Sequence, residues 1–151
     1  MTEPILTFSR TPSDAKIKLP AGATDSHVHI FGPADKFPYA ESRSFTPVDA
    51  PKETLFALHK KLGIDRCVIV NTLLHGYGNS VVEDAMQAAK GRYLGVALVK
   101  VDVADTELKR LASVGFRGVR FHFMPGYKVH ETPEQIIALT KRLEPLGMHL
   151  Q

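Results

Sequence analysis

The chain has 151 residues, of which 44% are hydrophobic and 23% are charged, so it can bury the core of one ordinary domain. Its formal net charge is only +3 and its Lys and Arg residues are scattered, which argues against nucleic-acid or membrane ligands and suits a small acidic substrate. A single cysteine, Cys67, excludes an intramolecular disulfide, and its place in an apolar run predicts a buried, unreactive thiol.

Residues 1–21 form a polar leader in which charged side chains interrupt every apolar run. We therefore expect no signal peptide, no membrane-spanning segment and a cytoplasmic location. Residues 22–151 are predicted to form the folded domain.

In that domain, short apolar or β-branched runs alternate with amphipathic runs. In chain order we predict a strand at 23–30, a Pro- and Phe-rich loop at 31–50, a helix from about 51 to 63, a strand at 66–72, a helix at 80–91, a strand at 93–99, a helix from about 105 to 115, a strand at 117–123, a helix from 132, and the start of a fifth strand at 148. Capping boxes are predicted to begin at Ser80 and Thr132, and His59 on the first helix is expected to face solvent. This alternation predicts an α/β fold with a parallel sheet.

Two parallel-sheet architectures compete. A doubly wound sheet that binds a nucleotide needs a Gly-rich turn directly after the first strand. Here that turn reads Phe-Gly-Pro and contains no phosphate-binding motif, which disfavours a nucleotide site.

The faces of the strands favour a barrel. The two-residue period of a strand places Asp25, His27 and His29 on one face of the first strand, and Arg120 and His122 on one face of the fourth. The opposite faces are apolar, as helix-covered faces must be, and the polar faces reach the carboxyl ends of the strands, where a barrel holds its chemistry. We predict the N-terminal half of a TIM-like (β/α)8 barrel, with about four βα units and the start of strand five.

His27 and His29 are the strongest candidates for chemistry. Two imidazoles at i and i+2 of a strand project about 7 Å apart. They can converge on one divalent metal or one substrate oxygen. Two incidental surface histidines are the alternative, but their place at the end of the first strand favours catalysis, with metal ligation by the same two residues if a metal is used.

Four stretches of the sequence match a known pattern: Asp25-Ser26-His27-Val28-His29-Ile30-Phe31-Gly32-Pro33, Phe56-Ala57-Leu58, Val68-Ile69-Val70 with His75-Gly76, and Gly115-Phe116-Arg117-Gly118-Val119-Arg120-Phe121. Through them, residues 22–151 resemble the amidohydrolase superfamily, within it the amidohydrolase-2 group, and specifically lactone hydrolases of the 2-pyrone-4,6-dicarboxylate lactonase type. The resemblance implies a (β/α)8 barrel of roughly twice this length. It also implies a hydrolase of small carboxylated lactones that works either without a cofactor or with one divalent metal such as zinc.

The resemblance assigns roles to matched residues. His27 and His29 would ligate a metal or polarise the lactone carbonyl, and Arg120 would bind a substrate carboxylate through its planar fork. His75, after the second strand, and His122 are further candidates for substrate binding. The family's general base would lie beyond the last residue, so this 151-residue form is expected to be inactive by itself.

Three positions depart from the lactonase pattern. Phe45, Leu73 and Gly126 stand where that pattern has a tyrosine, a small hydroxyl residue and a second arginine, which argues against the same pyrone dicarboxylate as substrate. Two other interpretations stay open. The chain could be a non-catalytic half-barrel that self-associates or assembles with a complementing half-barrel, or a metal- or ligand-binding module without turnover.

Overall fold

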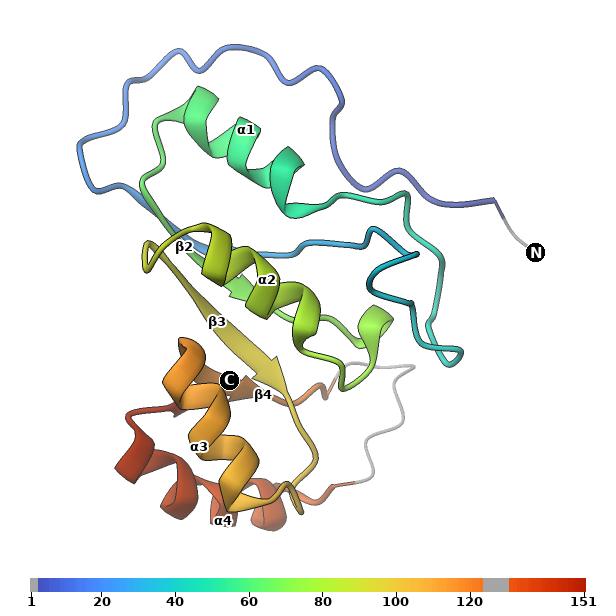
Figure 1. Ribbon diagram of the computed structural model, residues 1–151, viewed down its shortest axis with the longest axis vertical. Helices are drawn as coiled ribbons and strands as arrows, with labels where there is room; N and C mark the ends of the chain where they lie inside the picture. The colour runs from blue at the N-terminus through green and yellow to red at the C-terminus, as the bar shows by residue number, and fades with distance from the viewer. Residues whose placement is uncertain (1–2, 124–130) are drawn as a thin grey trace.

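Five parallel strands carry the fold in the computed structural model, which describes residues 3–123 and 131–151 (Figure 1). The elements in chain order are β1 (Thr24–Val28), α1 (Lys52–Leu62), β2 (Arg66–Val70), the short 3-10 helix η1 (Leu73–His75), α2 (Ser80–Ala88), β3 (Tyr93–Leu98), α3 (Asp105–Val114), β4 (Phe116–Arg120), α4 (Pro133–Leu143), the 3-10 helix η2 (Glu144–Leu146) and β5 (His149–Leu150). Every predicted strand and helix is present, and the strands end one to three residues earlier than the sequence predicts.

The order of the strands distinguishes the two candidate architectures. The sheet runs β1-β2-β3-β4-β5, and each strand pairs in parallel with the next one along the chain. A doubly wound sheet would reverse this order at its binding crevice. Sequential order with crossovers of one hand instead places every helix on the same face, as in the wall of a (β/α)8 barrel. The predicted α/β fold is confirmed.

The helices cover one face of the sheet. Helix α2 packs on β3, α3 on β4 and α4 on β5, and Figure 1 shows α2 lying across β2 and β3. The core between the two layers contains fully buried residues of β2, α3 and β4: Ile69, Leu108, Leu111, Phe116 and Val119. Burying a side chain of this size stabilises the fold by about 1.5–3 kcal/mol.

The two predicted capping boxes have different outcomes. At α4, the Thr132 hydroxyl accepts from the Gln135 backbone N–H at 3.3 Å, and the Gln135 side chain accepts from the Thr132 N–H at 2.8 Å, so this box is confirmed. The box at Ser80 is wrong, because Asn79 is the residue that precedes α2 and its side chain caps no helical N–H. The Asn79 amide instead bonds both backbone groups of Leu98, at 3.0 Å each, and so ties the start of α2 to the end of β3.

A β-bulge in β1 changes which side chains share a face. Asp25 is opposite Cys67 and Val28 is opposite Ile69, so three steps along β1 match two steps along β2. An extra residue of this kind reverses the alternation of side chains beyond it. Asp25 therefore points toward the helices, and the prediction that it shares a face with the two histidines is wrong.

His59 also departs from its predicted position. Only 1% of its surface is exposed, four residues after the buried Leu55 on the inner face of α1, and its Nε2 lies 3.3 Å from Asp25 Oδ2. The expectation that His59 faces solvent is wrong, because the i, i+4 spacing from Leu55 puts it on the core side of the helix. A buried imidazole needs polar partners, and Asp25, which the bulge directs toward the helices, is one of them.

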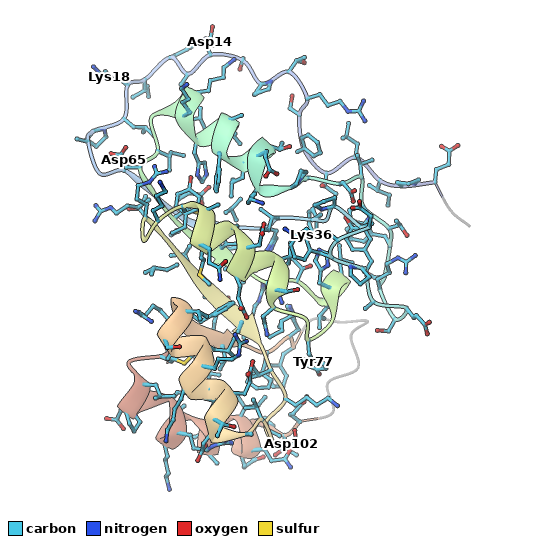
Figure 2. All side chains as sticks on the ribbon, in the orientation of Figure 1. Asp14, Lys18, Lys36, Asp65, Tyr77 and Asp102 are labelled. Atoms are coloured by element: carbon cyan, nitrogen blue, oxygen red, sulfur yellow. The ribbon has the colours of Figure 1, made fainter. Side chains whose placement is uncertain are left out.

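The leader follows the outside of α1. Lys61 donates to the Pro12 carbonyl at 2.6 Å and pairs with Asp14 at 2.9 Å, and Figure 2 shows Asp14 and Lys18 standing at the edge of the molecule. No helix in the described part of the chain has both the length and the apolar character needed to cross a membrane.

Candidate active site

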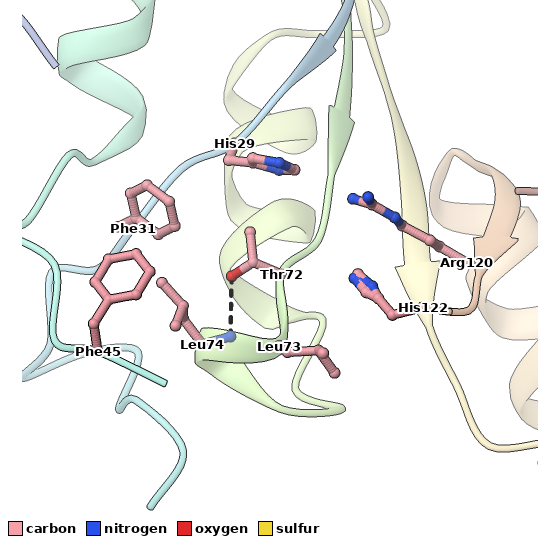
Figure 3. A pocket seen from close by; sticks show the side chains of 8 residues that line it. All are labelled: His29, Phe31, Phe45, Thr72, Leu73, Leu74, Arg120 and His122. Atoms are coloured by element: carbon pink, nitrogen blue, oxygen red, sulfur yellow. Dashed lines mark hydrogen bonds between the residues drawn. The ribbon is translucent and has the colours of Figure 1, made fainter. Parts of the chain in front are cut away.

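A pocket of about 190 Å³ opens at the carboxyl ends of β1, β2 and β4 (Figure 3). Its lining combines two imidazoles, a guanidinium and a hydroxyl with an aromatic and aliphatic wall: His29, Phe31, Phe45, Thr72, Leu73, Leu74, Arg120 and His122. Drug-sized ligands occupy pockets of roughly 300–1,000 Å³, so this one suits a smaller molecule.

The parallel sheet explains why residues so distant in sequence meet here. His29 directly follows β1, Arg120 is the last residue of β4, and His122 lies two residues beyond it. From β2, the chain turns into η1, whose first turn is capped by the Thr72 hydroxyl accepting from the Leu74 N–H at 3.2 Å. Parallel strands end at the same edge of a sheet, and the structure brings the predicted residues His29, Arg120 and His122 together there.

One hydrogen bond fixes the tautomer of His29. Its Nδ1 lies 2.7 Å from the Val70 carbonyl oxygen, which can only accept, so Nδ1 carries the proton. In the neutral ring, Nε2 then keeps its lone pair. Figure 3 shows the ring directed across the pocket toward Arg120. Neutral His29 therefore presents a proton acceptor, or a metal ligand, to anything bound in the pocket.

The pocket favours neutral imidazoles beside one permanent cation. Burial lowers the pKa of His29, and the nearby charges of His27 and Arg120 lower it further, while the bond to the Val70 carbonyl acts in the opposite direction. Burial and then the charges of Arg120 and His29 lower the pKa of His122. At neutral pH, Arg120 is therefore the one formally charged side chain among the described lining residues.

The other two candidate histidines lie outside this lining. The ring of His27 is exposed and meets the ring of His29 edge-on, with 5.1 Å between ring centroids. His75 is buried, and its Nε2 accepts from the Gly32 N–H at 3.2 Å while its Nδ1 donates to the Pro38 carbonyl at 3.3 Å. Both ring nitrogens of His75 thus tie the loop after β1 to η1.

Sequence reasoning identified only part of the pocket lining. Phe45 and Leu73, singled out as departures, both line the pocket, whereas Gly126 lies outside the described residues. Phe31 and Thr72 were not recognised as lining residues, although each directly follows a predicted strand or closes one, and that position is the signal that could have identified them.

A metal centre needs more donors than this part of the chain brings together. His29, with Nδ1 bonded to a carbonyl and Nε2 bearing the lone pair, has the arrangement of a metal-ligating histidine. The described residues, however, contain no group of three or more His, Cys, Asp or Glu side chains placed to hold an ion. These residues therefore do not make up a metal site by themselves.

Comparison with known proteins adds the family. Residues 24–151 match the amidohydrolase family Amidohydro_2. The chain is 40% identical over 145 residues to a 2-pyrone-4,6-dicarboxylate hydrolase from Comamonas testosteroni, a match that covers 96% of this chain and 48% of that protein. It is 47% identical over 107 residues to a 4-sulfomuconolactone hydrolase from Rhizobium radiobacter, covering 71% of this chain and 36% of that one.

A solved structure shares the fold. The probable 2-pyrone-4,6-dicarboxylic acid hydrolase from Acinetobacter baumannii, crystallised with citric acid bound, superposes with a TM-score of 0.73 at 22% identity, over 85% of this chain and 48% of that one. The chain thus spans about half the length, or less, of the relatives that it matches.

Proposed function

The chain belongs to the amidohydrolase family, and we propose that it contributes the histidine strand and the substrate-anchoring arginine of a hydrolase acting on small carboxylated lactones. The observation that carries this proposal is the pocket itself, where His29 and Arg120 face each other from opposite walls (Figure 3). Relatives named as hydrolases of a pyrone dicarboxylate and of a sulfonated lactone support an acidic, ring-shaped substrate.

The lining supports the same substrate class on physical grounds. Arg120 offers a planar fork that matches a carboxylate or sulfonate, and the described lining contains no acidic side chain to repel one. Phe31 and Phe45 supply aromatic surface for a flat ring. The substituted wall, with Phe45 and Leu73, offers fewer polar partners for a second acidic group on the ring.

Lactone hydrolysis requires a group that accepts a hydrogen bond from the attacking water and a group that holds the substrate in place, and we assign these roles to His29 and Arg120. A water oxygen must bond to the carbonyl carbon while the ring C–O bond breaks, and the product is a hydroxy acid that releases one proton at neutral pH. Neutral His29 would accept a hydrogen bond from that water at Nε2, because its Nδ1 is held by Val70. Arg120 would hold the substrate carboxylate and fix the carbonyl in the pocket.

A divalent metal stays a proposal that this part of the chain cannot support alone. If one is bound, His27 and His29 are the residues that would ligate it, and it would polarise the carbonyl or activate water. The remaining ligands would have to come from outside the described residues.

Binding of a flat aromatic dicarboxylate tests the pocket directly, because the described lining residues, Arg120 among them, all belong to this chain. We would titrate isophthalate into the protein by calorimetry, with benzene-1,3-dimethanol as the uncharged control ligand. Isophthalate should bind and the diol should not. Arg120→Lys should weaken binding at least about tenfold, since losing one charge-assisted hydrogen bond costs about 1.5–3 kcal/mol.

Arg117→Lys is the matched control on the same strand. Arg117 is exposed and donates to the Ala112 carbonyl at 2.8 Å, away from the pocket, so its replacement should leave binding unchanged. The proposal is wrong if millimolar isophthalate fails to bind, or if the Arg120 and Arg117 variants behave alike. Hydrolysis itself would be followed as proton release from a panel of carboxylated lactones, with the protein as the cell produces it.

A further inference from the structure

One row of residues crosses three strands on the helix-covered face of the sheet, opposite the pocket. Asp25 of β1 is opposite Cys67 of β2, and Cys67 is opposite Tyr93 of β3. The bulge in β1 brings Asp25 onto this face, where Cys67 and Tyr93 are 1% and 3% exposed. The imidazole of His59, from α1, spans the row from Asp25 to Tyr93.

Asp25 and Tyr93 of this row are joined through His59 by hydrogen bonds whose donors and acceptors can be assigned. His59 Nε2 lies 3.3 Å from Asp25 Oδ2, and His59 Nδ1 lies 2.6 Å from the Tyr93 hydroxyl. The carboxylate accepts, so Nε2 carries the proton of a neutral His59, and Nδ1 accepts from the Tyr93 O–H. Burial lowers the pKa of His59, which favours this neutral ring.

The series of hydrogen bonds ends at the backbone of β1, the strand that leads to His27 and His29. Asp25 Oδ1 accepts from the backbone N–H of His27 at 3.1 Å, within the bulged part of β1. A bulge leaves its extra residue outside the regular ladder, so a side chain that bonds this N–H takes the place of a strand partner. The other oxygen of the same carboxylate is held by His59.

We propose that Asp25, His59 and Tyr93 are positioning residues, which hold the β1 bulge so that His29 faces the pocket. Without the extra residue, the alternation along β1 would put Asp25 on the same face as both histidines. The Asp25 carboxylate, which is hydrogen-bonded at both oxygens, stabilises the bulged register of β1 instead. The catalytic purpose of this positioning rests on the proposed function, whereas the hydrogen bonds lie outside the pocket and do not depend on it.

The test separates this role from simple loss of stability. Asp25→Ala removes both bonds, Asp25→Asn keeps an oxygen for the His27 N–H, and Tyr93→Phe removes only the hydroxyl. Phe56→Leu is the packing control, because the Phe56 ring meets Tyr93 edge-on at 5.4 Å but takes no part in the hydrogen-bond chain. The readouts are hydrogen exchange at the His27 amide, nitrogen-15 shifts of the His29 and His59 rings, and isophthalate affinity.

We expect Asp25→Ala to speed exchange at His27 about tenfold or more, the scale of one lost bond to a charged acceptor. It should also mix the tautomers of His29 and weaken isophthalate binding. Asp25→Asn should restore most of the protection at His27, and Tyr93→Phe should alter the His59 ring signals. Phe56→Leu should leave the His27 exchange and the His29 tautomer unchanged, even though it lowers the melting temperature.

Two results would overturn the positioning role. One is unchanged His27 exchange and a single His29 tautomer in folded Asp25→Ala, or, if the alanine variant does not fold, unchanged His59 ring signals in Tyr93→Phe. The other is an equal effect of Phe56→Leu. If wild-type protein fails to bind isophthalate, the proposed function fails, while exchange at His27 still decides the positioning role.

Discussion

Replacing Asn79 by alanine should destabilise the protein far more than its place in a loop suggests. Its side chain bonds the N–H and the C=O of Leu98, at 3.0 Å each, and also accepts from the Asn71 side chain at 2.8 Å. Leu98 is 3% exposed, so both of its backbone groups would be left buried. At about 1–3 kcal/mol for each group deprived of a partner, we expect a loss of about 3 kcal/mol in the free energy of unfolding.

Urea unfolding followed by circular dichroism measures this loss. With an m-value of about 1–3 kcal/mol/M, the midpoint should fall by at least about 1 M. Ser80→Ala is the matched control. A capping box at Ser80 would make its removal cost about 1 kcal/mol. The structure assigns Ser80 no cap, so we expect a change below about 0.5 kcal/mol, as for an ordinary surface substitution. A loss below about 1 kcal/mol for Asn79→Ala, or a larger loss for Ser80→Ala, would refute the reasoning.

Four further predictions follow from the same geometry. Burial lowers the pKa of His29, His59 and His75 below the ordinary 6.5, so the unfolded chain binds more protons than the folded one in acid. The free energy of unfolding should therefore be greatest above pH 6.5 and fall as the pH drops below it, which thermal melts from pH 8 to 5 would measure. Burial raises the pKa of Cys67 to about 12, so a thiol reagent should modify it only on unfolding, and rapid labelling in native buffer would contradict its buried position. His29→Ala should lower lactone turnover about 100-fold or more in the full-length protein, the scale of losing a positioned base, and near-normal turnover would remove His29 from the mechanism. The outer edges of β1 and β5 pair with no other described strand, so we expect the 151-residue chain to self-associate, which a single 16.7 kDa species in light scattering would disprove.

The sequence by itself determined the fold class and the order of its elements. Alternation of apolar runs with amphipathic runs is a local property, and so are the glycine that ends α1 and the capping box that begins α4. Each of these signals lies within a few residues of the element that it specifies. The sequence could also predict that His29 and Arg120 line the same pocket. The carboxyl ends of parallel strands meet at one edge of the sheet, whatever the connecting helices contain.

Only the tertiary structure decided which face each side chain of β1 occupies. The period of two predicted Asp25 beside the histidines, but one extra residue between Asp25 and Val28 reverses that assignment. A bulge is fixed by the partner strand and by distant groups, here His59 and Tyr93, and no local pattern in β1 marks it. The same reason applies to Asn79, whose side chain bonds a strand nineteen residues away in sequence rather than the helix that it precedes.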